Sequence, residues 1–186
     1  MRVDALTGWL DAARHVCSPN WDERPAGCRI DLIVVHGISL PPGEFGGSWI
    51  DALFTNTLDP VAHPYFAAIA GLRVSAHLLI RRDGQLTQYV SCHHRAWHAG
   101  ESIYAGRRRC NDFSIGVELE GADTIPYDDR QYPALATVIR ALREAYPAIL
   151  PNRLAGHADI APGRKTDPGP AFDWRRLRRL LGEQTD

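Results

Sequence analysis

The chain has 186 residues, of which 45% are hydrophobic and 23% charged, a balance typical of a single globular domain. Its formal net charge of −1 at pH 7 gives no overall field that would recruit nucleic acid or a membrane surface. No run approaches the roughly 20 apolar residues that cross a bilayer. We therefore predict one domain over residues 1–186, without nucleic-acid or membrane partners.

The N-terminal segment MRVDALTGWLDAARHV includes Asp4 and Asp11 and contains no apolar stretch of signal-peptide length. This favours a cytoplasmic protein, provided that no upstream segment has been removed. The four cysteines are scattered without a C-x-x-C pair, so reduced thiols are favoured over disulfides or a zinc finger. Because no strongly apolar surface element is evident, we expect a monomer.

The first strong strand signal is R-I-D-L-I-V-V-H, which ends at His36. Its three consecutive β-branched residues predict a strand buried on both faces. The prolines and glycines of the following I-S-L-P-P-G-E-F-G-G predict a loop, after which Ser48 is expected to cap a helix that begins at Trp49. His36 therefore ends a buried strand and opens a loop, where α/β sheets commonly place functional groups.

Further elements follow along the chain. A short helix is predicted over 65–70, and V-S-A-H-L-L-I-R-R-D-G-Q-L-T-Q-Y-V predicts a hairpin with Asp83 and Gly84 in its turn. Apolar residues alternate over 113–119, and others recur at helical spacing near 130–146. The irregular succession of strands and helices predicts a mixed α/β fold, in which a central mixed β-sheet is flanked by helices.

The segment G-H-A-D-I-A-P-G-R-K-T-D-P-G-P holds His157, Lys165 and Asp167 in a predicted irregular loop. Imidazole nitrogens and carboxylate oxygens are ordinary zinc donors, and three protein ligands with an open fourth position are typical of catalytic zinc. Spacing along the chain does not establish that His36 converges with His157 and Asp167. The arginine-rich segment that follows is interpreted as a helix with a solvated charged face.

The other histidines have simpler interpretations. His15 and His63 are expected at the surface, His77 within a strand with its hydrogen bonds satisfied, and His93 and His94 in a loop.

The alternation over 113–119 turns Glu118 away from the apolar face of its strand. Two interpretations stay open, a carboxylate directed into a cleft and a strand glutamate in a salt bridge. Glu120 lies two residues further on, so both glutamates point the same way, and the pattern does not separate them.

Six segments occur in the order found in one family: L-I-V-V-H, I-S-L-P-P-G, V-S-A-H-L-L-I-R-R-D-G, R-A-W-H-A-G, N-D-F-S-I-G-V-E-L-E-G and G-H-A-D-I-A-P-G-R-K-T-D-P-G-P. Through them the chain resembles the type-2 N-acetylmuramoyl-L-alanine amidases over nearly its whole length. Within the family it is most similar to the cytoplasmic enzymes that act on 1,6-anhydro-muropeptides. The resemblance implies a central mixed β-sheet flanked by helices, with zinc in a groove on the sheet.

The resemblance also implies the roles of individual residues. His36, His157 and Asp167 match the ligands of one Zn²⁺ ion, Glu118 the catalytic acid/base, and Lys165 the lysine that supports the transition state.

Further positions match the family's substrate contacts. Arg73 and Arg109 match positions expected to contact the carboxylates of the peptide stem, and Trp97 and His98 match part of the wall beside the sugar and the peptide. The chain departs from the pattern at Gly37, where the family's anhydro-muropeptide branch commonly has asparagine. The departure leaves the metal ligands intact and puts substrate affinity or the loop conformation in question.

The implied activity is zinc-dependent hydrolysis of the amide between (1,6-anhydro-)N-acetylmuramic acid and L-alanine, in cytoplasmic recycling of peptidoglycan. Two alternatives are a binding module of the same fold that has lost catalysis and an amidase that acts on intact cell wall. Binding modules typically lack a zinc ligand, whereas this chain keeps all three.

Overall fold

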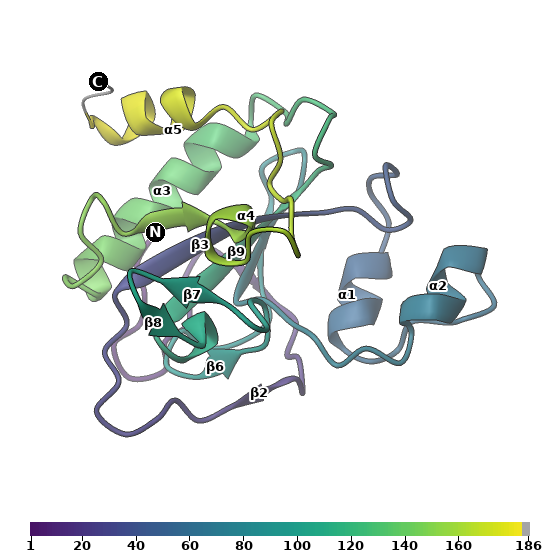
Figure 1. Ribbon diagram of the computed structural model, residues 1–186, viewed down its shortest axis with the longest axis horizontal. Helices are drawn as coiled ribbons and strands as arrows, with labels where there is room; N and C mark the ends of the chain where they lie inside the picture. Colours follow the sequence, from purple (N-terminus) through teal and green to yellow (C-terminus); the bar gives the residue numbers. More distant parts are fainter. Residues whose placement is uncertain (184–186) are drawn as a thin grey trace.

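The computed structural model describes residues 1–183 (Figure 1). At its centre lies a six-stranded sheet in the order β1-β5-β4-β9-β3-β10. Its strands are β1 (Arg14–His15), β3 (Leu32–Ile38), β4 (Leu78–Ile80), β5 (Leu86–Gln88), β9 (Ser114–Glu120) and β10 (Leu154–Gly156). The β4–β5 pair is antiparallel and the other neighbouring pairs are parallel, so the predicted mixed sheet is confirmed.

Two small antiparallel sheets and several helices complete the fold. The small sheets pair β2 (Trp21–Asp22) with β6 (Arg95–Ala96) and β7 (Ile103–Tyr104) with β8 (Arg107–Arg108). The helices are α1 (Trp49–Phe54), α2 (Pro64–Ile69), α3 (Gln131–Ala145), α4 (His157–Ile160) and α5 (Trp174–Leu181), with the 3-10 helix η1 (Cys110–Asp112).

The local predictions are largely confirmed. The predicted helices near 65–70 and 130–146 are α2 and α3, and the predicted hairpin is β4–β5 with Asp83 and Gly84 between its strands. Four details are wrong. β3 continues past His36 to Ile38, and His77 lies just before β4 rather than within a strand. Ser48 precedes α1 but makes no capping hydrogen bond with its side chain. The motif segment starting at His157 opens with the short helix α4 rather than being irregular throughout.

One face of the sheet packs against α3, and α5 packs against α3; the two helices lie together at the upper left of Figure 1. The alternation along β3 and β9 sends every second residue to this side, where Ile33 and Val35 of β3 and the apolar residues of β9 meet the apolar face of α3. This cluster contains, among others, Ile33, Val35, Ile115, Val117, Leu119, Leu135, Val138, Ile139, Leu142 and Leu177. It is the main hydrophobic core and fixes which residues of β3 and β9 face the other way.

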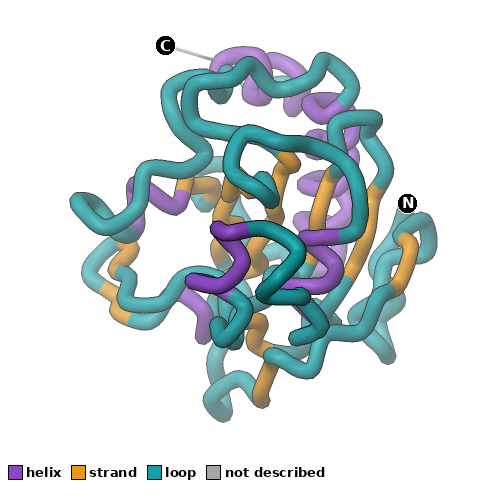
Figure 2. Tube along the Cα trace, turned by 90° about the vertical axis from the view of Figure 1, so that its right-hand side faces the viewer, coloured by secondary structure: helices purple, strands orange, loops and turns teal. Residues whose placement is uncertain are grey.

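The opposite face is apolar at two places and polar between them. Leu32 and Val34 of β3 pack with Phe113, and Leu79 of β4 packs beneath α1 and α2. These two helices lie at the right of Figure 1, away from α3 and α5, and in front of the strands in Figure 2. The polar residues between, which include His36, are those that build the site described below.

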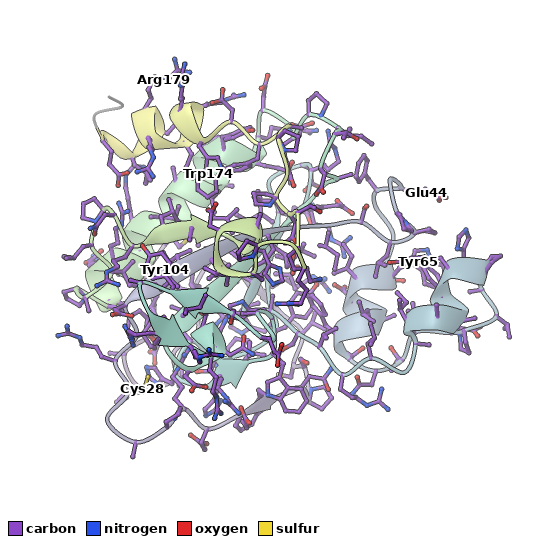
Figure 3. The ribbon with its side chains drawn as sticks, in the orientation of Figure 1. Cys28, Glu44, Tyr65, Tyr104, Trp174 and Arg179 are labelled. Atoms are coloured by element: carbon purple, nitrogen blue, oxygen red, sulfur yellow. The ribbon has the colours of Figure 1, made fainter. Side chains whose placement is uncertain are left out.

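The remaining expectations concern the surface and the cysteines. Leu177 of α5 is buried while Arg175 and Arg179 are exposed, and Figure 3 shows Arg179 pointing outward, so the solvated arginine face is confirmed. All four cysteines are free. Among residues 1–183, no helix has both the length and the apolar character needed to span a bilayer.

His77 lies immediately before β4 and is fully buried with both ring nitrogens in hydrogen bonds. Its Nδ1 accepts from the backbone N–H of Gly116 at 3.0 Å, and its Nε2 lies 3.1 Å from the carbonyl oxygen of His94, to which it donates. Burial lowers the pKa of His77 well below its ordinary value, and the charge of Arg24 lowers it further. Protonation of Nδ1 would remove the acceptor for Gly116, so the fold requires a neutral ring.

We expect His77 to make the protein less stable in acid. As the pH falls below about 6.5, the unfolded chain takes up a proton at His77 before the folded chain does, so stability is lost by up to about 1.4 kcal/mol per pH unit. Urea unfolding between about pH 7 and about pH 5 measures this slope. The variant His77→Asn keeps an acceptor for Gly116 without a titratable ring, so its slope should be smaller; equal slopes would contradict this assignment.

Candidate active site

Three side chains that can bind a metal converge at one end of the sheet: His36, His157 and Asp167. His36 lies near the end of β3, and His157 follows β10 directly. Because β10 pairs in parallel with β3, with Gly156 opposite Val35, the two histidines lie side by side at the carboxyl ends of these strands. The backbone oxygen of Asp167 accepts from the N–H of Ala158 at 2.9 Å, which folds the loop after α4 back toward His157.

The three donor atoms form a nearly equilateral triangle. The two Nδ1 atoms of His36 and His157 lie 3.0 Å apart, and Oδ2 of Asp167 lies 3.2 Å from the first and 3.1 Å from the second. A tetrahedral zinc ion with donors at about 2.0–2.1 Å separates neighbouring donors by about 3.3–3.4 Å. The donor types and their spacing therefore fit a zinc ion with one position open.

Burial and mutual contact also set the charges of this group. Burial lowers the pKa of His36 to about 4, so the ring is neutral at pH 7, as a metal ligand must be. Burial by itself would raise the pKa of Asp167, but its short contacts with His157 and His36 outweigh burial and hold the pKa below its ordinary value. The set therefore consists of a neutral imidazole and a carboxylate ion beside a second imidazole.

Glu118 lies on β9 directly opposite His36 of β3, on the same face of the sheet. Its side chain is buried, and among the described residues its Oε2 has no hydrogen-bond partner. Burial raises the pKa of Glu118 well above its ordinary value, Asp167 adds to the rise, and Lys165 opposes it. A buried, unpartnered carboxylate oxygen beside three metal donors fits a group that handles a proton at a metal centre.

Glu120 resolves the ambiguity that the strand pattern left open. It shares the face of Glu118, but its oxygens accept from the backbone N–H of Gly46 at 2.7 Å and of Arg82 at 3.2 Å, and Oε1 also lies 3.3 Å from the Arg81 guanidinium. Glu120 thus holds the loop before α1, while Glu118 is left free to face the site.

A cavity of about 630 Å³ opens over these groups. Its polar wall contains His36, Glu118, His157, Lys165 and Asp167. The apolar wall comes from α1, α2 and the segment after α2, with Leu53, Phe54, Tyr65, Ile69, Leu72 and Val74. Figure 3 places Tyr65 on α2 and Glu44 on the loop before α1 at the same side of the molecule. One side of the cavity thus suits charged and polar atoms, and the other suits an apolar surface.

The expected substrate contacts divide into two groups. Trp97 and His98 line the cavity. Arg73 and Arg109 do not belong to its lining: Arg73 is exposed between Leu72 and Val74, and the exposed Arg109 lies 3.3 Å from the carboxylate of Asp112. The structure therefore brings the metal donors, Glu118, Lys165, Trp97 and His98 together and leaves the two arginines outside the cavity lining, while the roles of all these residues stay predictions.

Two residues of the site gave no signal in the sequence. The Tyr127 hydroxyl donates to the carbonyl oxygen of Pro168 at 2.9 Å, next to Asp167. Arg164 lines the cavity and donates to the carbonyl oxygen of Ala99 at 2.6 Å. Both lie in irregular segments, where no periodicity indicates which way a side chain points.

The chain is similar in sequence and in structure to proteins of one known family. The profile of the family described as N-acetylmuramoyl-L-alanine amidase matches residues 26–170. The chain belongs to the N-acetylmuramoyl-L-alanine amidase family. It is 65% identical to 1,6-anhydro-N-acetylmuramyl-L-alanine amidase AmpD of Escherichia coli K12 over 178 residues, which cover 96% of this chain and 97% of that protein.

Solved structures of N-acetylmuramoyl-L-alanine amidases share the fold. A crystal structure of a selenomethionine derivative of AmpD has a TM-score of 0.94 at 64% identity, covering 97% of this chain and 99% of that chain. The Escherichia coli amidase AmiD, in complex with the substrate anhydro-N-acetylmuramic acid-L-Ala-D-gamma-Glu-L-Lys, has a TM-score of 0.61 at 28% identity, covering 88% and 62%. The family resemblance, the mixed α/β fold and the enzyme class, an N-acetylmuramoyl-L-alanine amidase, are thereby confirmed.

Gly37, the departure from the family pattern, faces the side of β3 opposite to His36. A Cβ atom at this position would lie 2.2 Å from the Tyr127 hydroxyl oxygen and 3.5 Å from the ring carbon that carries it. The absence of a side chain at Gly37, next to His36 in sequence, therefore leaves room for the Tyr127 hydroxyl to donate to the carbonyl oxygen of Pro168. In this amidase the position contributes space for Tyr127.

We expect Gly37→Ala to lower the free energy of unfolding by about 1–3 kcal/mol, because the new methyl group overlaps the Tyr127 hydroxyl. In the background Tyr127→Phe, which removes that oxygen, the same substitution should cost much less. Denaturant unfolding of the two single variants and the double variant measures the coupling. Additive effects would show that the hydroxyl does not restrict position 37.

Proposed function

We propose that the protein hydrolyses the amide bond between 1,6-anhydro-N-acetylmuramic acid and L-alanine in muropeptides, with one zinc ion held by His36, His157 and Asp167. In this role it acts as a cytoplasmic monomer in the recycling of peptidoglycan fragments. The observation that carries the proposal is the convergence of three metal donors beside the unpartnered oxygen of Glu118. The names of the AmpD relatives and the substrate bound to AmiD support the choice of muropeptide.

Held by His36, His157 and Asp167, a zinc ion would supply Lewis acidity, which would polarise the carbonyl group and make a water molecule more acidic. The carboxylate of Glu118 accepts the proton of the attacking water, as the water adds to the lactyl carbonyl carbon. When the carbon–nitrogen bond breaks, Glu118 returns this proton to the alanine nitrogen. The ammonium group of Lys165 stabilises the negative charge that develops on the carbonyl oxygen.

The environment of Glu118 suits this exchange of a proton. Burial and Asp167 favour its protonated form, while the Lys165 charge favours the carboxylate. A bound cation would add to the effect of Lys165. The opposed influences bring the two forms closer in free energy, as a group that both accepts and donates a proton in one cycle requires.

The remaining substrate contacts are proposed for Arg73, Trp97, His98 and Arg109. The ring of Trp97 and the apolar wall from α1 and α2 offer surface for the sugar and the alanine methyl group. The guanidinium groups of Arg73 and Arg109 are exposed outside the cavity lining, where a carboxylate further along the peptide stem can reach them.

The variant Glu118→Gln tests the catalytic role directly. It keeps the size of the side chain but cannot accept a proton, so zinc content should stay at one ion per chain while kcat falls at least about 10²-fold. Glu120→Gln is the matched control, because it lies on the same strand and face but already accepts hydrogen bonds from Gly46 and Arg82. Its kcat should remain close to that of the wild type. Nearly unchanged turnover of Glu118→Gln would contradict the mechanism.

The choice of substrate is tested by comparing soluble anhydro-muropeptides with intact sacculi. We expect the purified zinc-loaded protein to release peptide from the anhydro-muropeptide with much the higher kcat/KM, since the cavity is closed on one side by α1 and α2. Preferential digestion of sacculi would instead favour an amidase of the intact wall. Binding of muropeptide without cleavage would favour a module that has lost catalysis.

A further inference from the structure

Both candidate zinc-binding histidines have their outer ring nitrogen in a hydrogen bond to one short segment. His157 Nε2 lies 3.3 Å from the carbonyl oxygen of Ala99, so this nitrogen carries a proton and donates it. His36 Nε2 lies 2.9 Å from Nδ1 of His98, the preceding residue. The outer hydrogen bond of a metal-binding histidine determines its tautomer and ring orientation, and thereby which nitrogen is left for the metal.

The direction of the His36–His98 bond follows from the groups beyond it. The carbonyl oxygen of Cys110 can only accept, and the Ser114 hydroxyl lies 2.6 Å away, so the single hydroxyl proton points to it. The oxygen of Ser114 therefore accepts from Nε2 of His98, 3.2 Å away. In a neutral ring with a proton on Nε2, Nδ1 has none, so His98 Nδ1 accepts from His36 Nε2.

The ring of His98 has little freedom to depart from this arrangement. It is buried and lies flat against Gly116 of β9, where a Cβ atom would be 2.5–2.8 Å from three of its ring atoms. The backbone N–H groups of His98 and Ala99 donate to Oδ1 of Asn111 at 3.2 and 2.7 Å. The side chain is therefore fixed from the strand below it and from its own backbone.

We propose that His98 and Ser114 are positioning residues that hold His36 in the tautomer with its proton on Nε2. The lone pair of His36 Nδ1 then faces His157 and Asp167, ready for the metal before it binds. This role acts through His36, requires no contact with the substrate and involves no change in protonation. It rests on the proposed zinc site, and it differs from the substrate-wall position that the family resemblance gives to His98.

Zinc affinity of the purified full chain, measured by competition with a chelator, tests the proposal. The variant His98→Leu removes the acceptor for His36 Nε2 and should weaken zinc binding about 10–100-fold. His98→Asn places an amide oxygen near the position of Nδ1 and should restore affinity to within a few-fold of the wild type. Ser114→Ala leaves the His98 Nε2 proton without an acceptor and should also weaken zinc binding. This second variant keeps the test decisive if His98→Leu fails to fold.

His77→Asn is the matched control. His77 is buried like His98 and packs edge-on against its ring at a centroid distance of 5.6 Å, but among the described residues it has no hydrogen bond to His36. This variant should lose stability without losing zinc affinity. A second readout is the long-range ¹H–¹⁵N spectrum of the zinc-free protein, in which His36 Nδ1 should carry no proton in the wild type and partly gain one in Ser114→Ala.

The outcomes separate this inference from the proposed function. Unchanged zinc affinity in both His98→Leu and Ser114→Ala, with a wild type that binds one zinc ion, would overturn the positioning role and leave the zinc site standing. A loss in His77→Asn equal to that in His98→Leu would reduce His98 to a packing residue. A wild type that binds no zinc would overturn the proposed zinc site itself.

Discussion

The parallel pairing of β3 with β9 is the constraint on which the site depends. Its register places His36 opposite Glu118 and, on the other face, Val35 opposite Val117. The β-branched residues that pack against α3 therefore decide which way the functional side chains point. A slip of one residue would turn Glu118 into the core beneath α3, where a carboxylate without a partner costs several kcal/mol. The hydrophobic core and the active site thus specify the same register.

That register gathers groups that are costly to bury. Two imidazoles, the carboxylate of Asp167 and the unpartnered oxygen of Glu118 lie together in a protein interior that solvates charge poorly. With the ring protons of His36 and His157 on Nε2, no proton lies between their Nδ1 atoms and Oδ2 of Asp167, and nothing among the described residues donates to Oε2 of Glu118. A divalent cation would offset the excess of negative charge, so the cost of burying these groups and their affinity for a metal have the same origin.

Features that depend on residues close together in the chain could be predicted from the sequence, whereas features that depend on contacts between distant residues could not. The buried strand that contains His36, the β4–β5 hairpin and α3 follow from local pattern and turn chemistry, and the structure agrees except that β3 continues to Ile38. The convergence of His36 with His157 depends on β10 pairing with β3 across more than a hundred residues, which only the family resemblance indicated. The alternation of the strand could not distinguish Glu118 from Glu120, because residues two apart point to the same face of the sheet. It is decided by Gly46 and Arg82, whose N–H groups reach only Glu120.

The sequence pattern also did not indicate the residues that support the metal ligands, because their positions depend on the space left by two glycines. At Gly116 the missing Cβ makes room for the His98 ring, which contacts His36. At Gly37 it makes room for the Tyr127 hydroxyl, which reaches the residue after Asp167. A glycine in a strand normally weakens it, and both of these lie in the pair that sets the register. The strands therefore lose some stability at the two positions where the missing side chains let His98 support His36 and Tyr127 support the segment that carries Asp167.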